Sequence, residues 1–369
     1  MKYFLLLFIL LLIGCSAQVD LDSTLDLPVL DIEHLMEVSE SEDLLLGSIT
    51  NLLVDSDGDL ILVDGSQRYV YAVNAEGEFI QQVGARGSGP GEYEFPGIVQ
   101  LADDNSIHLF DWGSRSMIVY TKNNGVWSFS SDFTADFNQY GFFTQFFTAA
   151  NNQYYIVTSP MRIDEEDSKL IVRKIDNTGG LVQDSVYVFP QNERFTVFEN
   201  GMPRMSMTIP SMHRQGRFYA DYTGNTYFGW TDSLTIFRRA LDEQEFTPIL
   251  NSSIKNTPFT SSTRDTLLSN YENLLSENNQ ARRDLISSFP DTKPVYSDFK
   301  VDDNGRIWVQ IFNEEEGTDW FVFSSEGEPM YRAELPDGYR LHAVRHNMLY
   351  TVNNTEDGIP VVNIFSYNF

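Results

Sequence analysis

The feature that most constrains the fold of this chain is a repeated phrase of four alternating apolar runs separated by short polar turns. In the clearest copy, residues 49–83, the runs cover 49–55, 60–64, 69–74 and 78–83. Turn pairs such as Asp57-Gly58 and Glu76-Gly77 separate them. Because glycine and asparagine reach the positive φ of tight hairpin turns at little steric cost, we predict one antiparallel four-stranded sheet for each copy.

Further copies of the phrase lie at 97–133, 142–190, 212–250, 295–335 and 340–369. The last copy has room for only three strands, whereas a lone apolar segment, 32–38, precedes the first copy. That segment would complete the last sheet and close a ring. Sheets arranged radially leave only short, protected edges. We therefore predict an all-β fold: a six-bladed β-propeller with four-stranded blades, closed by an N-terminal strand.

One segment, 262–289, departs from this pattern. It begins at Ser262-Thr263, carries apolar residues at helical spacing, such as Leu267, Tyr271 and Leu274, and ends before Pro290. We predict a helical insertion of ~25 residues between the fourth and fifth blades. It either braces the propeller or serves as a lid or docking element.

The N-terminus has the layout of an export signal. A positive charge at Lys2 is followed by apolar residues 4–13, a stretch shorter than the ~20 residues of a membrane-spanning helix. The residues Leu12-Ile13-Gly14-Cys15 resemble the lipobox of bacterial lipoproteins, which implies a diacylglycerol on Cys15 and cleavage before it. The alternative is ordinary cleavage after Ser16-Ala17, which would leave Cys15, the single cysteine of the chain, near the cut.

These patterns predict a signal peptide (1–14), a lipidated tether (15–28) and a propeller (29–369). We expect a cell-envelope protein at the outer membrane, held by its lipid alone, with the periplasmic or surface face left open. With 53 acidic against 25 basic residues, the formal charge is -28. Such a chain repels phosphate backbones, which excludes nucleic acid as a partner.

A family resemblance rests on residues 84–96, Gly-Ala-Arg-Gly-Ser-Gly-Pro-Gly-Glu-Tyr-Glu-Phe-Pro, together with the Asp-Gly strand pairs at 54–63 and 301–309. Over about residues 30–369 the chain resembles the six-bladed, NHL-like β-propeller lipoproteins of the Bacteroidetes and related bacteria. The resemblance implies the fold and the anchor. It does not choose an activity, because NHL-like propellers include ligand-binding and protein-binding members as well as lyases and lactonase-like enzymes.

Candidate binding residues follow from a spacing that recurs in consecutive blades. Asp64 and Asp111 are each followed four residues later by an arginine, at the junction of the second and third strands. Each pair either ties a loop or recognises a ligand carboxylate or hydroxyl, and the recurrence favours the tie. The Gly-rich loop 86–95 should lie on the same rim, and Trp112 stands at a strand end. The full set of candidates is Asp64, Arg68, Arg86, Glu92, Tyr93, Asp111, Trp112 and Arg115.

No catalytic residue and no metal site is predicted. The acidic run 55–59 has the composition of a calcium loop, but Gly58 is its fourth residue and Ser66 its twelfth, where an EF-hand requires glycine sixth and glutamate twelfth. We expect a non-catalytic module whose rim and central funnel bind a glycan, peptide or envelope protein, with no cofactor beyond the lipid on Cys15. The alternatives left open are a minor Ca²⁺ site and a lactonase- or lyase-like enzyme with a divalent metal in the central channel.

Overall fold

The computed structural model describes residues 27–102, 104–134, 137–149, 153–159, 169–199, 202–240, 243, 245–252, 254–275, 279–312 and 318–369. The predicted signal peptide, Cys15 and most of the predicted tether lie outside the described residues. Within the described part, no helix is both long and apolar enough to cross a membrane.

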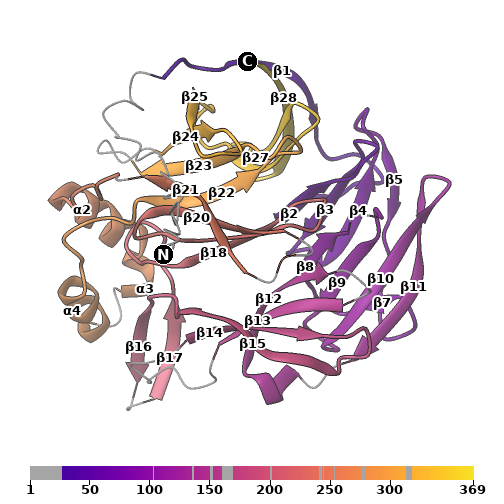
Figure 1. Cartoon of the computed structure of the whole chain (residues 1–369), viewed down its shortest axis with the longest axis horizontal. Helices are drawn as coiled ribbons and strands as arrows, with labels where there is room; N and C mark the ends of the chain where they lie inside the picture. The colour runs from indigo at the N-terminus through magenta and orange to yellow at the C-terminus, as the bar shows by residue number, and fades with distance from the viewer. Residues whose placement is uncertain are drawn as a thin grey trace, which may run out of the picture.

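Six four-stranded antiparallel sheets surround a central axis (Figure 1), which confirms the predicted six-bladed propeller. Blade one comprises β2 (Ile49–Val54), β3 (Leu60–Asp64), β4 (Tyr69–Val73) and β5 (Phe79–Gln82); blade two comprises β8 (Pro96–Leu101), β9 (Ile107–Asp111), β10 (Ser116–Asn123) and β11 (Val126–Thr134). Blade three comprises β12 (Phe142–Ala149), β13 (Gln153–Ser159), β14 (Lys169–Ile175) and β15 (Leu181–Pro190). Blade four comprises β18 (Gly216–Ala220), β19 (Thr226–Trp230), β20 (Leu234–Arg239) and β21 (Thr247–Ser252), and blade five β22 (Tyr296–Val301), β23 (Ile307–Phe312), β24 (Thr318–Phe323) and β25 (Pro329–Ala333).

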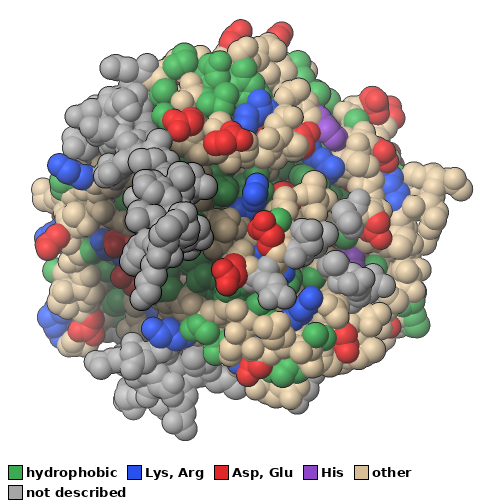
Figure 2. All heavy atoms as spheres, viewed as in Figure 1, with side chains coloured by type: hydrophobic (Ala, Val, Ile, Leu, Met, Phe, Trp, Pro, Cys, Tyr) green, Lys and Arg blue, Asp and Glu red, His purple; other side chains and the backbone are tan. Residues whose placement is uncertain are grey.

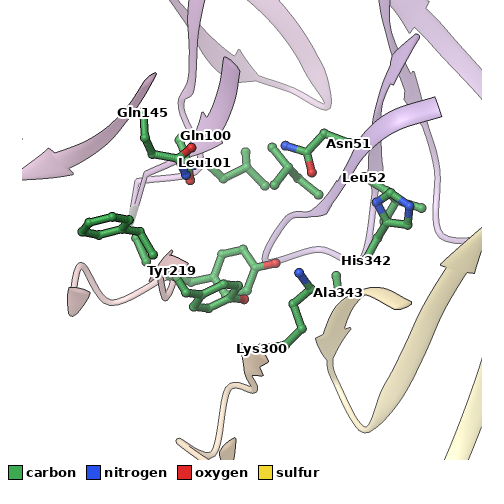
Figure 3. A pocket seen from close by; sticks show the side chains of 13 residues that line it. Asn51, Leu52, Gln100, Leu101, Gln145, Tyr219, Lys300, His342 and Ala343 are labelled. Atoms are coloured by element: carbon green, nitrogen blue, oxygen red, sulfur yellow. The ribbon is translucent and has the colours of Figure 1, made fainter. Parts of the chain in front are cut away.

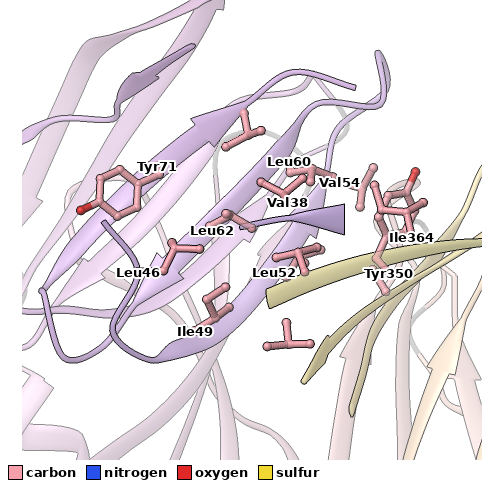
Figure 4. Packing of buried hydrophobic residues seen from close by; sticks show 14 of the residues in the cluster. Val38, Leu46, Ile49, Leu52, Val54, Leu60, Leu62, Tyr71, Tyr350 and Ile364 are labelled. Carbon is pink, nitrogen blue, oxygen red and sulfur yellow. The ribbon is translucent and has the colours of Figure 1, made fainter. Parts of the chain in front are cut away.

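The sixth blade closes the ring as predicted. It combines β26 (Arg340–Arg345), β27 (Met348–Asn354) and β28 (Pro360–Asn368) with the N-terminal strand β1 (Asp31–Val38). Asp31 pairs with Asn368 and Val38 with Val362. Figure 4 shows how Val38 packs with Leu52 and Ile364 between this blade and blade one. Fully burying such a side chain stabilises the fold by roughly 1.5–3 kcal/mol. The packing between blades six and one therefore stabilises the closed ring.

Six hairpin turns share one pattern of hydrogen bonds. Oδ1 of Asp55 accepts hydrogen bonds from the backbone N–H groups of Asp57 and Asp59, and Gly58 has φ 91°. Oδ1 of Asp302 does the same for Asn304 and Arg306. In the same way, a side-chain oxygen accepts hydrogen bonds from two backbone N–H groups at Asn74, Asp176, Asp221 and Ser324. An Asp, Asn or Ser three residues before a glycine therefore sets the turns that made the repeat visible in the sequence.

Two insertions form an accessory unit on one side of the ring (left in Figure 1). The predicted helical segment consists of three short helices, α2 (Ser261–Asn270), α3 (Glu272–Leu275) and α4 (Asn279–Ser287), and Thr260 caps the first. The hairpin β16 (Phe195–Glu199) and β17 (Met202–Met207), between blades three and four, was not predicted. Phe195 and Val197 of the hairpin join Leu267 and Leu285 of the helices in one buried cluster. This shared core supports the bracing role for the helical insertion.

The two ends of the ring are built differently. At the connection rim, the chain passes from blade to blade and enters each innermost strand; this rim carries residues 64–68, the loop 84–95 and residues 111–115. At the hairpin rim lie the turns that follow the innermost strands, such as 55–59 and 346–347. Figure 2 shows that the Asp and Glu side chains on one face are scattered and do not gather in one patch.

Candidate ligand site in the central channel

The two repeated aspartates of the connection rim are structural. The carboxylate of Asp64 is fully buried and accepts hydrogen bonds from the backbone N–H groups of Gly47 (2.6 Å), Ser48 (3.2 Å), Ser66 (3.0 Å) and Gln67 (2.8 Å). Asp111 repeats this arrangement with Glu94 (3.2 Å), Phe95 (2.7 Å), Gly113 (3.1 Å) and Ser114 (2.9 Å). Burial alone would raise the pKa of Asp111, but these hydrogen bonds outweigh it and lower the pKa. These backbone contacts favour the structural interpretation of Asp64 and Asp111, and their predicted binding role stays a prediction.

Arg68 and Arg115 are exposed on the same rim, and both have left-handed backbones, with φ 61° and 58°. The guanidinium carbon of Arg68 lies 5.1 Å from the centroid of the Phe95 ring. In the described chain Arg68 makes a cation–π contact and no ion pair with Asp64, so the expected Asp-Arg tie does not form there. Both arginines stay accessible at the rim.

The Gly-rich loop is held by its own side chains. Tyr93 has no exposed surface; its hydroxyl accepts from the N–H of Val70 (3.1 Å) and donates to the carbonyl of Val83 (3.0 Å). Tyr93 is therefore a core residue, and its burial argues against the predicted binding role. The Glu92 carboxylate accepts from the N–H of Gly89 (2.8 Å) and clips the loop, while Arg86 is exposed.

Trp112 forms an aromatic platform with Phe142 at the connection rim. The two rings stack with centroids 6.2 Å apart and planes 22° apart. Phe142 is 58% exposed and opens the innermost strand β12. The indole lies against Gly97, where an added Cβ would come within 1.9 Å of it. Only glycine at position 97 leaves room for Trp112 in this position.

A cavity of about 150 Å³ lies in the central channel (Figure 3). The innermost strand of every blade contributes a polar side chain to its wall: Asn51 (β2), Gln100 (β8), Gln145 (β12), Tyr219 (β18), Lys300 (β22) and His342 (β26). Each is partly exposed to the cavity. None of these six residues is among the candidates predicted from the sequence, although one polar residue in each innermost strand is a signal that could have identified them.

Most of these side chains have spare hydrogen-bonding capacity. Among the described residues, the side chains of Gln100, Gln145, Tyr219 and His342 have no protein hydrogen-bond partner. Asn51 uses one amide hydrogen, which it donates to the carbonyl of Val99 (3.2 Å). Polar groups inside a protein are normally paired, so a wall of unpaired groups requires water or a ligand.

A small charge cluster lies beside them. The Lys300 ammonium is 2.7 Å from the Asp298 carboxylate, and Arg217 donates to the carbonyl of Ser297 (2.6 Å). Burial disfavours an ionised Asp298, but Lys300 and Arg217 outweigh it and hold its pKa below the ordinary value. Burial, aided by Lys300 and Arg340, lowers the pKa of His342 to about 4. At neutral pH the channel therefore presents a neutral imidazole beside two cations and one carboxylate.

The end of the channel toward the hairpin rim is narrowed by Arg345 and Tyr222. The Arg345 guanidinium carbon lies 3.6 Å from the centroid of the Tyr222 ring, and Arg345 donates a hydrogen bond to the carbonyl of Val54. Arg345 is buried. Tyr222 also lines the cavity, so this pair forms part of its wall on the side of the hairpin rim.

The acidic run 55–59 holds a lysine. Nζ of Lys122 lies 2.6 Å from Asp55, 2.7 Å from Asp57 and 2.8 Å from Asp59. The ammonium takes the place that a cation would need, which favours the hairpin interpretation of this run. The described residues contain no group of three or more His, Cys, Asp or Glu side chains that could hold a metal ion.

The fold and the channel define a six-bladed β-propeller with a polar central cavity. Residues 16–319 match the DUF5128 family, described as 6-bladed beta-propeller, and because the match spans most of the chain, the chain belongs to this family. No curated protein matches the sequence significantly.

Solved structures share the fold at low identity. A protein described as exported, from Bacteroides fragilis NCTC 9343, is 15% identical with a TM-score of 0.57, over 92% of this chain and 96% of that one. A DUF4221 family member from Bacteroides vulgatus ATCC 8482 is 9% identical with a TM-score of 0.53, over 92% and 98% of the two chains. At these identities the likeness establishes the propeller fold alone.

Proposed function

We propose that this protein is an envelope lipoprotein that binds a small polar ligand in its central channel without transforming it. One observation carries the proposal: Gln100, Gln145, Tyr219 and His342, from four different blades, meet at one cavity without protein partners among the described residues. Convergent, unpaired polar groups in a concave site are typical of ligand pockets.

The lining chemistry favours binding over catalysis. Among the residues that the structure describes, the cavity wall includes no serine, threonine, cysteine or carboxylate. Asp298, near the wall, is neutralised by Lys300 at 2.7 Å. A divalent metal, as in the rival lactonase- or lyase-like function, would find His342 and amide oxygens beside a lysine and an arginine, which is a poor donor set for a doubly charged cation.

Export and anchoring rest on the N-terminal sequence. The family match begins at residue 16, directly after Cys15, and one protein with the same fold is described as exported. Metabolic labelling with radioactive palmitate should mark the native protein in its source bacterium and leave Cys15→Ser unlabelled. An unlabelled native protein would contradict the anchor and would leave the channel site standing.

Native mass spectrometry tests the binding function directly. Purified protein is incubated with the small-molecule fraction of the source cells' envelope and growth medium. We expect a retained mass in the native protein and in Gln280→Trp, which alters an exposed residue of α4, and its loss in Gln145→Trp, which fills the channel. Native protein that retains nothing would contradict the function. Stoichiometric divalent metal by elemental analysis would favour the rival.

A further inference from the structure

We propose that the ligand is the end of an acidic glycan, with one uronate ring inside the channel and the next ring on the aromatic platform. This inference rests on the proposed binding function and names its ligand class. Three independent features of the described residues support it: the amides of the channel wall, the platform at its mouth, and the charge beside Lys300.

The amides match the chemistry of sugar hydroxyls. Each carboxamide of Gln100 and Gln145 offers two donors and one acceptor oxygen, and Asn51 keeps its oxygen free among the described residues. A sugar hydroxyl both donates and accepts, so neighbouring hydroxyls can satisfy such groups in pairs. A cavity of about 150 Å³ suits one pyranose ring and is too small for a folded peptide segment.

The platform adds the apolar half of sugar recognition. One side of a pyranose ring presents C–H groups, which stack on the faces of aromatic rings. Phe142 and Gln145 lie on the same innermost strand, and a bulge before Gln145 places them opposite Ser159 and Val157, two residues apart on the neighbouring strand, which corresponds to on the order of 7 Å along the strand. That separation accommodates two linked sugar rings. The geometry therefore assigns one ring to the platform and one to the amides.

The local charge selects an acid. Arg217 and Lys300 flank the single carboxylate of Asp298, so this part of the channel carries one positive charge in excess. The formal charge of the whole chain is -28, but salt screens charges beyond about 10 Å. Inside the channel a ligand carboxylate would gain a charge-assisted hydrogen bond from Lys300, with neutral His342 beside it.

Titration calorimetry at pH 7 compares three acidic disaccharides, digalacturonate, dimannuronate and cellobiouronate, each against its neutral counterpart. We expect at least one acidic probe to bind about tenfold tighter than its neutral counterpart. Lys300→Met should remove that preference, so that the acidic and neutral members of the pair bind equally. Trp112→Leu and Gln145→Leu should weaken both members of the pair about tenfold, and Lys169→Met, at an exposed position, should change neither. Thermal unfolding verifies that each variant is folded.

The outcomes separate the two proposals. Equal affinity for acidic and neutral probes would overturn the charge argument. Failure of every disaccharide to bind, while native mass spectrometry shows a retained ligand that is not a sugar, such as a peptide, would overturn the ligand class and leave the binding function intact. Absence of any retained ligand would remove the binding function itself.

Discussion

The Lys122 ammonium, on β10 of blade two, lies 2.6 Å from the buried carboxylate of Asp55 at the hairpin rim of blade one. Burial would lower the pKa of Lys122, but its hydrogen bonds to Asp55, Asp57 and Asp59 outweigh it and raise the pKa. The same contacts lower the pKa of Asp57. One side chain therefore both neutralises a turn and joins two blades.

Replacing Lys122 should lower the stability of the folded protein. Lys122→Met leaves three aspartates without their counter-charge, and we expect the free energy of unfolding to fall by on the order of 3 kcal/mol. Urea denaturation measures the loss, with the exposed Lys169→Met as the control. Millimolar Ca²⁺ should restore part of the stability of Lys122→Met alone, because the vacated aspartates can then bind a cation. Equal stability of the two variants would contradict the structural role.

Asp64 should stabilise the folded state through the backbone N–H groups that donate hydrogen bonds to its carboxylate. Asp64→Asn replaces an acceptor-only group with an amide whose donors face the N–H groups of Gly47 and Gln67. We expect a loss of about 2 kcal/mol in urea denaturation, since buried donors are left unpaired. Asp337→Asn, at an exposed position, should change little. A ligand affinity that falls while stability holds would instead return Asp64 to the binding site.

Three histidines that the fold largely shields from bulk water make stability depend on pH. Burial lowers the pKa of His108, His213 and His342 to about 4 each, against about 6.5 in an unfolded chain. Between these values the unfolded chain binds protons that the folded chain does not, so stability is complete above pH 6.5 and falls as the pH drops toward 4.

The expected slope is up to about 1.4 kcal/mol per pH unit for each histidine. Urea unfolding at pH 7, 6 and 5 measures it. His108→Gln, which can keep bonds to Ser106 and Tyr154, should flatten the slope. NMR titration provides a direct check, because imidazole signals of these residues that titrate near pH 6.5 would be inconsistent with burial.

Gly97→Ala should displace the indole of Trp112. The added Cβ would come within 1.9 Å of the ring, so we expect a loss of about 1–3 kcal/mol and an altered near-ultraviolet circular dichroism spectrum. In a Trp112→Leu background the same change should cost less, because the clash is gone. An identical cost in both backgrounds would show that the contact does not explain the glycine.

The propeller was predictable because its constraints are local. Six hairpin turns depend on a side chain such as Asp302 and a glycine three residues later, here Gly305, so the pattern recurs along the chain. The Asp64 and Asp111 spacing was visible for the same reason, because each carboxylate holds the same backbone N–H groups in its blade. Repetition in sequence thus pointed to architecture more reliably than to ligand contacts.

The channel could not be predicted in the same way. Gln100, Gln145 and His342 are far apart in sequence and meet only because the ring brings the innermost strands together. Gln100 and His342 each stand between two apolar residues, so neither forms part of a motif. The hairpin β16–β17 was missed because a proline, Pro203, within a short run argues against a strand, whereas the tertiary cluster with Leu267 stabilises the hairpin.

The pairing of Asp31 with Asn368 starts β1 at the hairpin rim, beside the turn 346–347. If Cys15 carries the lipid that we propose, the tether would join the propeller at that end. The platform of Trp112 and Phe142, at the opposite rim, would then face away from the lipid surface and toward dissolved ligands. The anchored propeller would then present the connection rim of its channel to the aqueous phase, away from the membrane.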